Sequence, residues 1–266
     1  RALGWQVESV PWRTRGVPWD EFEAVVIRSP WDYQDDPEAF LDVLAEIERS
    51  QAELFNSLDL IRWNLSKTYL RDLEGRGVAT VPTLWQDGLQ SGDLDRIFDQ
   101  VGADEIVLKP LISANADGAF RLNRQTPAER IAQAQAYYSR RPFLAQPFLR
   151  SVVDEGEFSL FYFNGEYSHC ILKTPKPRDF RVQEEHGGDI RAAQPEQSLL
   201  SSAQQVLDAL QSPPLYARAD LVRCNADDNT PFRLMELELI EPSLYLRMDP
   251  DAPARFAQAL NTRATH

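Results

Sequence analysis

Two apolar runs separated only by Asn164 and Gly165 constrain the fold of this chain more than any other feature. The runs, EFSLFYF and EYSHCIL, each have the length of a strand. An Asn-Gly pair suits the two left-handed positions of a type I′ turn, which joins antiparallel strands. The sequence therefore predicts an antiparallel β-hairpin in the second half of the chain.

The first sixty residues follow a different pattern, in which short strands alternate with a helix. Strands are predicted in WQVESV, FEAVVIRSP and AELFN, and a helix is predicted over residues 37–49. The helix has a clear start, because Asp36 can cap it and Pro37 occupies a first position where a missing N–H costs nothing. This alternation predicts a small parallel α/β unit.

Candidate substrate contacts follow from this unit, because ligands gather beyond the carboxyl ends of parallel strands. The segment at that place is RSPWDY, residues 28–33, and its candidates are Arg28, Trp31 and Asp32. In the alternative interpretation, Trp31 and Tyr33 only pack, and Arg28 forms an ion pair with Asp32.

The segment from residue 64 to 147 is predicted to contain both helices and strands. Helices are predicted in NLSKTYLRDLEGRG and over residues 93–101, and strands in EIVLKPLI and FLAQPFL. A further helix is predicted to begin with a capping box, in which Thr126 is the N-cap, Pro127 the first residue and Glu129 the third.

The stretch FRLMELELIEPS, residues 232–243, combines acidic and apolar residues. In a strand, Glu236 and Glu238 share one side with Leu234 and Ile240. Two carboxylates on one partly apolar face repel each other unless they reach water or a positive charge lies between them.

A third carboxylate is expected beside these two. Asp220 lies in the strand predicted in LYARADLV, and a turn around residues 227–229 would pair this strand antiparallel with the acidic one. Magnesium is the natural counter-ion, because it is a hard cation that binds carboxylate oxygens. Asp220, Glu236 and Glu238 are therefore candidate metal ligands, and the alternative is an acidic face exposed to water.

Five cations accompany these acids along the chain. Lys109 ends a predicted strand and precedes LISANADGAF, a small and polar segment whose backbone N–H groups could surround a phosphate. The others are Lys67, Lys173, Arg181 and Arg218. Each is weak evidence alone, because most lysines are solvated and LISANADGAF matches neither the Walker pattern nor the dinucleotide fingerprint.

The composition narrows the class of partner. A formal net charge of −13 argues against a general binder of nucleic acid or acidic membranes, which leaves small molecules as ligands.

The sequence has neither an apolar run of roughly 20 residues nor the apolar stretch of a signal peptide, so a cytoplasmic location is expected. Cys170 and Cys224 lack the spacing of a zinc site or disulfide framework. Because a predicted strand follows Arg1 almost at once, a further strand and helix are expected upstream.

The order of these residues resembles that of the ATP-grasp superfamily, specifically its glutathione-synthetase-like carboxylate-amine ligases. The order is Lys67, Lys109, a small-residue loop, AQPFL, DEGEFS, Lys173, Arg181 before HGG, Arg218, Asp220, and ELE before Pro242. The likeness covers nearly the whole chain. It implies an α/β (α+β) fold with an N-terminal Rossmann-like parallel domain, residues 1–63, a central lid, residues 64–147, and a C-terminal antiparallel-sheet domain, residues 148–266.

The resemblance also implies a site for ATP and Mg²⁺. Lys67 and Lys109 would contact the phosphates and the adenine, and the loop from Ser113 to Gly118 would close over the triphosphate. The backbone of a hinge would recognise the edge of the adenine. This hinge consists of Gln146, Pro147, Phe148 and Leu149. Two magnesium ions, with Mn²⁺ as an alternative, would be held by Asp220, Glu236 and Glu238, although the family more often has Asn at position 238.

Arg181 and Arg218 would face the transferred phosphate and the acceptor carboxylate, with Lys173 as a third catalytic cation. The segment VQEEHGG departs from the glutathione synthetase pattern, so glutathione precursors are poorly supported as substrates. RSPWDY and ELELIEPSLYL look closer to a bacterial branch that includes the cyclo-ligase closing the D-cycloserine ring.

The implied reaction is ATP- and Mg²⁺-dependent formation of an amide-type bond between a small carboxylate and an amine, through an acyl phosphate. Two alternatives stay open, a phosphotransferase on the same scaffold and a non-catalytic nucleotide-binding module. His186 is either an aid to proton removal or a bystander, and a homodimer is left open.

Overall fold

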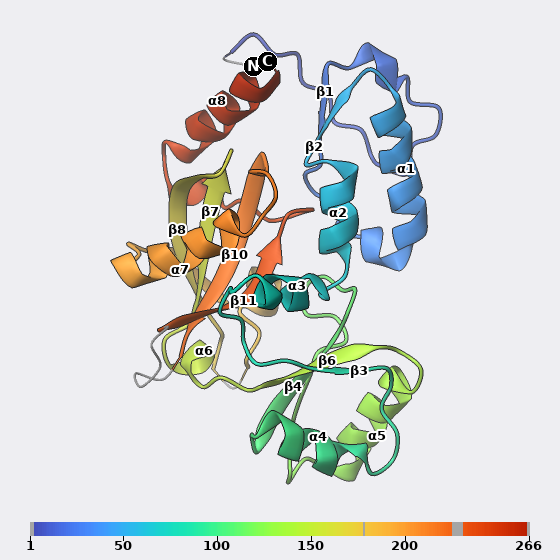
Figure 1. Ribbon diagram of the computed structural model, residues 1–266, viewed down its shortest axis with the longest axis vertical. Coiled ribbons are helices and arrows are strands. Elements are labelled where there is room, and N and C mark those ends of the chain that lie inside the picture. The colour runs from blue at the N-terminus through green and yellow to red at the C-terminus, as the bar shows by residue number, and fades with distance from the viewer. Residues whose placement is uncertain (1–2, 178, 225–230, 265–266) are drawn as a thin grey trace.

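In the part of the chain that the structure describes, three β-sheets and the helices packed on them make up the fold (Figure 1). The structure is a computed structural model that describes residues 3–177, 179–224 and 231–264. No helix in these ranges is long and apolar enough to cross a membrane. Short 3-10 helices lie at Trp19–Glu21, Tyr33–Asp35, Glu184–His186 and Leu246–Met248.

The first sheet is the small parallel unit that the alternating pattern predicts. It pairs β1 (Ala24–Val26) with β2 (Glu53–Phe55), and α1 (Pro37–Arg49) connects them. Helix α1 begins as predicted, since Asp36 Oδ1 accepts a hydrogen bond of 3.2 Å from a backbone N–H of the first turn. The strand predicted at residues 5–10 is wrong, because this largely exposed segment has no described strand beside it to pair its backbone.

The second sheet is antiparallel and lies at the bottom of Figure 1. Its strands lie in the order β3 (Leu84–Gln86), β6 (Phe143–Pro147), β4 (Glu105–Pro110) and β5 (Phe120–Asn123). Two helices, α4 (Asp93–Val101) and α5 (Ala128–Tyr138), pack against it through buried side chains that include Ile97, Phe98 and Tyr138.

The capping box predicted for α5 is wrong. The helix begins at Ala128 with Pro127 as its N-cap, and no side chain caps it. Thr126 Oγ1 instead accepts a hydrogen bond of 2.7 Å from Asn123 N. The hydroxyl therefore closes the turn that precedes the helix.

The third sheet has five antiparallel strands, and helices cover both of its faces. The strand order is β11 (Phe232–Glu238), β10 (Tyr216–Arg223), β7 (Glu157–Phe163), β8 (Glu166–Thr174) and β9 (Asp189–Ala192). One face packs against α7 (Gln197–Asp208) and the other against α8 (Ala252–Ala264), while the short α6 (Ser151–Asp154) precedes β7.

The predicted hairpin is confirmed in this sheet. Strands β7 and β8 pair antiparallel, and the turn residues Asn164 and Gly165 have positive φ angles of 53° and 81°. The turn predicted at residues 227–229 lies outside the described residues.

The helix predicted from NLSKTYLRDLEGRG is two helices. The first, α2 (Leu58–Leu65), ends before Ser66, whose backbone is extended, and the second is α3 (Tyr69–Gly75). The break has a tertiary cause, because Lys67 N donates a 2.8 Å hydrogen bond to Leu111 O in the segment after β4. Because the Lys67 N–H is used in this bond, it cannot form the i→i−4 hydrogen bond of a continuous helix. The same bond holds Lys67 beside the second sheet.

Side chains from α2, α3 and the segment after β2 occupy the outer edge of β11. Asn64 accepts a hydrogen bond of 3.0 Å from Leu239 N and donates one of 2.9 Å to Leu237 O. Asn56 donates to Leu239 O at 2.9 Å. Tyr69 OH accepts from Leu237 N at 2.9 Å. The edge strand with the two predicted acidic ligands is thereby fixed against the N-terminal part of the chain.

Replacing Asn64 by alanine is expected to lower the free energy of unfolding by about 2–3 kcal/mol, because one buried donor and one buried acceptor lose their partners. Urea unfolding followed by circular dichroism measures this change. The control is Gln204→Ala on α7, where the exposed amide donates only to the side chain of Asp208 and the expected loss is below about 0.5 kcal/mol. Equal losses in the two variants would contradict this role of Asn64.

Candidate active site

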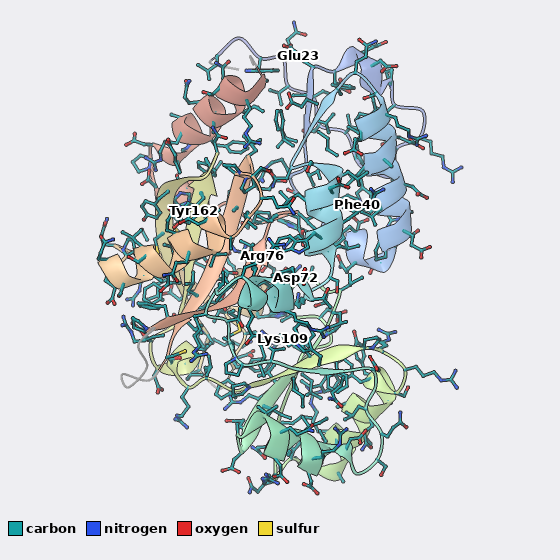
Figure 2. All side chains as sticks on the ribbon, in the orientation of Figure 1. Glu23, Phe40, Asp72, Arg76, Lys109 and Tyr162 are labelled. Carbon is teal, nitrogen blue, oxygen red and sulfur yellow. The ribbon has the colours of Figure 1, made fainter. Side chains whose placement is uncertain are left out.

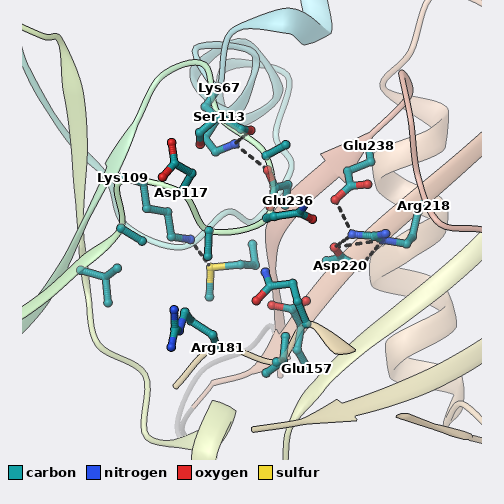
Figure 3. Close-up of a pocket in the computed structure, with 18 of the residues that line it drawn as sticks. Lys67, Lys109, Ser113, Asp117, Glu157, Arg181, Arg218, Asp220, Glu236 and Glu238 are labelled. Carbon is teal, nitrogen blue, oxygen red and sulfur yellow. Dashed lines mark hydrogen bonds and ion pairs between the residues drawn. The ribbon is translucent and has the colours of Figure 1, made fainter. Parts of the chain in front are cut away.

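A pocket between the second and third sheets collects the charged side chains of the site (Figure 3). All the residues predicted for the site line this pocket except Arg28, Asp32 and Gly118. Seven acids and five cations are among the lining residues: Asp117, Glu157, Glu185, Asp220, Glu236, Glu238, Glu241, Lys67, Lys109, Lys173, Arg181 and Arg218.

The three acids predicted to bind metal lie on two neighbouring strands. Strands β10 and β11 pair antiparallel as expected, and their register sets Asp220 opposite Glu236 and Arg218 opposite Glu238. Each acid offers one oxygen, and the three oxygens lie within 4.8 Å of one another. Their separation suits a single small cation or a close pair of cations bound by carboxylate oxygens.

Protein cations separate these carboxylates. Lys67 Nζ lies 2.7 Å from Glu236 Oε1. Arg218 forms an ion pair of 2.9 Å with Asp220 and a second, closer one with Glu238. The alternative of an acidic face exposed to water is wrong, because Asp220 is buried and side-chain exposure is 28% for Glu236 and 23% for Glu238.

Burial and the neighbouring charges act differently on the three acids. Burial raises the pKa of Glu238 to about 7 against the opposing effect of Arg218, and the other two carboxylates add to the increase. Burial also acts against ionisation of Asp220, but Arg218 and Lys173 bring its pKa below the usual value. The pKa of Glu236 is lowered too, since Lys67 and Lys109 outweigh the effect of burial.

Lys173 and Glu157 form a second layer behind Asp220. Lys173 is 3% exposed, and its Nζ lies 2.5 Å from Glu157 Oε1 and 3.3 Å from Asp220 Oδ1. Asp220 also accepts a short hydrogen bond from Ser159 Oγ. This network holds the Asp220 carboxylate in one orientation at the base of the pocket.

Lys109 differs from the other cations, because within the described residues no carboxylate lies within ion-pair distance of its Nζ. The nearest polar partner is Met235 Sδ at 3.1 Å, a weak acceptor. Burial lowers the pKa of Lys109, with Glu236 opposing that effect. The side chain lies where the second and third sheets meet (Figure 2) and can neutralise an anion that enters the pocket.

Of the predicted loop from Ser113 to Gly118, residues 113–117 line the pocket. Asn115 and Ala116 have positive φ angles of 53° and 57°. The Asn115 carbonyl lies 3.0 Å from His186 Nε2, which joins this loop to the loop after β8. Gly118 lies away from the pocket lining, because a Cβ there would be 2.3 Å from the Tyr137 hydroxyl.

Arg181 lines the pocket but lies apart from Arg218, on the side nearer Lys109 (Figure 3). Its Nη2 is 2.8 Å from Asp179 Oδ2 and its Nε is 3.1 Å from Oδ1 of the same carboxylate. Hydrogen bonds from Arg181 hold the pKa of Asp179 well below its usual range. The two arginines therefore reach different parts of the pocket.

The structure corrects two of the three predicted substrate contacts. Trp31 lines the pocket, and its Nε1 donates a 3.2 Å hydrogen bond to Glu241 O. Asp32 is outside the lining because Trp12 and Arg13 donate to its carboxylate at 2.7 and 2.8 Å.

Arg28 is also outside the lining, and its predicted ion pair with Asp32 is wrong. Its guanidinium lies 5.5 Å from the ring centroid of Tyr216, and its Nη2 is 3.5 Å from Pro242 O. Its side chain therefore points toward the core, next to the segment that follows β11.

Outside the predicted loop at residues 113–118, three acids of the pocket were absent from the predicted site: Glu157, Glu185 and Glu241. Glu157 opens the apolar run EFSLFYF, and a charge at the start of a fully buried strand is the signal that points to it. Glu241 falls outside the alternation of Glu236 and Glu238. Burial and the nearby Glu238 raise the pKa of Glu241 to about 8.

Comparison with known proteins places this pocket in a family. Residues 1–56 match the N-terminal domain of D-cycloserine synthetase DcsG, and residues 80–218 match the ATP-grasp domain of prokaryotic glutathione synthetase. The cycloserine biosynthesis protein DcsG of Streptomyces lavendulae is 34% identical over 280 residues, which cover 99% of this chain and 90% of that protein. The chain belongs to the ATP-grasp ligases.

Solved structures agree with this assignment. The crystal structure of D-cycloserine synthetase DcsG has a TM-score of 0.83 and 31% identity, and the match covers 99% of this ATP-grasp ligase and 91% of that chain. D-alanine–D-alanine ligase from Bacillus anthracis, solved with ATP, shares the fold at a TM-score of 0.64 and 12% identity, over 92% and 80% of the two chains.

The resemblance to glutathione-synthetase-like ligases and the α/β ATP-grasp fold are therefore confirmed. This ATP-grasp ligase is an ATP-dependent carboxylate-amine ligase, an enzyme of a superfamily that uses ATP with Mg²⁺.

Proposed function

We propose that this ligase phosphorylates a small carboxylate with ATP and joins the resulting acyl phosphate to an amine. The observation that carries the proposal is the meeting of Asp220, Glu236 and Glu238 with Lys109 in one pocket. Transfer of a phosphoryl group to a carboxylate brings two anions together, so it needs fixed positive charge more than it needs a protein nucleophile.

The three acids would hold Mg²⁺, and we propose two ions, with Mn²⁺ as an alternative. Their oxygens are hard ligands that lie within 4.8 Å of one another, which fits either metal. Bound there, the ion would neutralise phosphate charge. Lys67 forms an ion pair with Glu236, and Arg218 forms one with Glu238. A bound metal ion would therefore share these two carboxylates with the lysine and the arginine.

The cations have separate proposed roles. Lys109 would bind the phosphates, because of the five cations that line the pocket it alone has no carboxylate partner among the described residues. Lys67 would join it, since its Nζ also lies 3.4 Å from Ser113 O in the loop that would close over the triphosphate. Arg218 and Arg181 would orient the acceptor carboxylate from different sides, and Lys173 would position Asp220.

The proposed chemistry balances without a covalent enzyme intermediate. A carboxylate oxygen attacks the γ-phosphorus and ADP leaves; the amine nitrogen then attacks the acyl carbon, phosphate leaves, and the proton lost by the nitrogen passes to the departing phosphate or to water. A thiol nucleophile is not needed, and burial raises the pKa of the Cys170 thiol to about 12, far from the range in which thiolates form.

D-cycloserine formation is the first reaction to test, because the chain is 34% identical to DcsG over nearly its whole length. In a ring-closing ligation, one substrate carries both the carboxylate and the amine. Trp31 and Glu241 lie on the pocket wall nearest the first sheet, and we propose that this wall contacts the acceptor.

The decisive measurement is phosphate release from ATP with a panel of small carboxylates, amines and amino acids. Release is expected only when carboxylate and amine are both present, in one molecule or two, and mass spectrometry identifies the product. With hydroxylamine in place of the amine, an acyl phosphate yields a hydroxamate. A stable phosphorylated product without hydroxamate would overturn the ligation mechanism and favour a phosphotransferase.

A further inference from the structure

Glu241 is a buried acid of the pocket that has no cation beside it. It lines the pocket and is 9% exposed. Among the residues that the structure describes, no lysine or arginine lies within ion-pair distance of its carboxylate, whereas each of the three acids of the proposed metal group has such a partner. A buried carboxylate without a cation is costly, so a ligand that brings a positive charge to it gains affinity.

Two residues of the segment after β1 hold Glu241 on the pocket wall. Trp31 Nε1 donates a 3.2 Å hydrogen bond to the Glu241 carbonyl. The Tyr33 hydroxyl interacts with the Glu241 carboxylate, and Tyr33 lines the pocket as well. Main chain and side chain of Glu241 therefore have separate supports, and both supports come from the first domain.

The charged groups that act most on the Glu241 carboxylate line the same pocket. They are Glu238, Lys67 and Glu236. Burial and then the like charge of Glu238 raise the pKa of Glu241, and the opposing effects of Tyr33 and Lys67 offset this increase only in part. The carboxylate thus lies on the inner side of the wall, and its protein neighbours leave its charge incompletely balanced.

Glu241 is separate from the acids that converge on the proposed metal position. Within the described residues, Asp220, Glu236 and Glu238 are the acids whose oxygens lie within 4.8 Å of one another, and Glu241 is not a member of this group. It follows Glu238 by three residues, beyond the end of β11. Its negative charge is therefore available to a cation other than the metal.

An exposed aromatic ring lies on the same wall. Trp31 lines the pocket and is 48% exposed, although it is a large apolar residue. Its hydrogen bond to the Glu241 carbonyl keeps the indole next to this acid. A carboxylate beside an exposed indole suits an ammonium group, which gains an ion pair from the first and a cation–π attraction from the second.

Arg218 provides the opposite charge in the same part of the pocket. It forms an ion pair with Glu238, which is also the charge that acts most strongly on Glu241. The guanidinium that we propose to orient the acceptor carboxylate and the unpaired Glu241 therefore both neighbour Glu238. A molecule that carries a carboxylate and an ammonium group a few bonds apart matches this arrangement of charges.

We propose that Glu241 binds an ammonium group of the carboxylate substrate, so that this ligase activates an amino acid in preference to a simple carboxylic acid. The ammonium group bound in this way is not the attacking amine, because a protonated nitrogen has no lone pair. The inference rests on the proposed ligase function and names the substrate class for it.

The first test compares amino acids with hydroxy acids that differ from them only at position 2. The pairs are serine with glycerate, alanine with lactate and aspartate with malate, each as both enantiomers. Hydroxamate formation is measured with hydroxylamine as the nucleophile, so the nitrogen of the amino acid is not needed for the chemistry. The wild type is expected to favour an amino acid by at least ~100-fold in kcat/KM over its hydroxy acid. Equal use of the two members, or hydroxamates from none of these amino acids, would overturn the inference.

The second test removes the charge of Glu241 and keeps its shape. Glu241→Gln is expected to reduce the preference for the amino acid at least ~10-fold, chiefly through a higher KM for the amino acid, while KM for ATP changes less than about twofold. Glu185→Gln is the matched control, because Glu185 also lines the pocket but is exposed. It should keep the wild-type preference. An equal loss in the two variants would mean that any acid of the pocket attracts the amino acid, and the assignment to Glu241 would be wrong.

The dependence on Mg²⁺ distinguishes an ammonium site from a metal site. The Mg²⁺ concentration that gives half of the maximal rate is expected to agree within about twofold between the wild type and Glu241→Gln. A shift of about tenfold or more would make Glu241 a metal ligand and would overturn the inference. If hydroxamates form from hydroxy acids as readily as from amino acids, the inference about Glu241 is wrong and the ligase proposal stands. If no carboxylate gives a hydroxamate, both are wrong.

Discussion

Replacing Glu236 by glutamine is expected to lower kcat about a thousandfold, which corresponds to about 4 kcal/mol in the activation barrier. The substitution removes the negative charge but almost no volume, so the proposed metal group loses one of its three anionic ligands. Steady-state phosphate release at several Mg²⁺ concentrations measures the loss. We expect excess Mg²⁺ to restore a small part of the rate, because two carboxylates remain.

The stability of Glu236→Gln should change by less than about 1 kcal/mol, since the lost ion pair with Lys67 is partly exposed. Glu155→Gln is the matched control, because the side chain of Glu155 is 32% exposed, close to the 28% of Glu236, and it pairs with Arg223 outside the pocket lining. It is expected to keep wild-type turnover. Wild-type turnover in Glu236→Gln would defeat the metal assignment.

The parts of the fold that could be predicted are those with local causes. The turn at Asn164 and Gly165 needs positive φ angles that few residue pairs adopt readily, and the start of α1 depends on the adjacent Asp36. The pairing of β10 with β11 followed because the two strands are close in sequence.

The parts that could not be predicted have distant causes. Helix α2 ends because Lys67 N bonds to Leu111 O, and the sequence around residue 67 carries no sign of that partner. Asp32 leaves the pocket because Trp12 and Arg13, about twenty residues earlier, bind its carboxylate.

The candidate site shows the same limit. Its three acids could be identified from spacing within two strands, but the cations that neutralise them come from other elements. Lys67 is 169 positions from Glu236, and no periodic pattern links residues at that separation. Gly118 was predicted because it belongs to the small-residue loop. Its backbone instead packs against Tyr137 and does not face the pocket.

Replacing Lys173 by methionine is expected to lower the free energy of unfolding by about 3–5 kcal/mol, because the substitution leaves a buried carboxylate without its closest cation. Methionine fills most of the space of the lysine stem, so the loss reports on charge rather than on a cavity. Asp220 keeps Arg218 and Ser159, which makes Glu157 the acid most affected.

A double-mutant cycle with Glu157→Gln tests this account of Lys173. If the ion pair is the cause, Lys173→Met combined with Glu157→Gln should regain at least half of the stability lost in Lys173→Met, because the uncompensated charge is gone. Lys176→Met is the control on the same segment, where the lysine is half exposed and its ion pair with Asp179 spans 3.8 Å; the expected loss is below about 0.5 kcal/mol. Urea unfolding of the four proteins gives the coupling free energy. Strict additivity of the two substitutions would mean that the ion pair between Lys173 and Glu157 contributes nothing to stability, and this explanation of the loss in Lys173→Met would then fail.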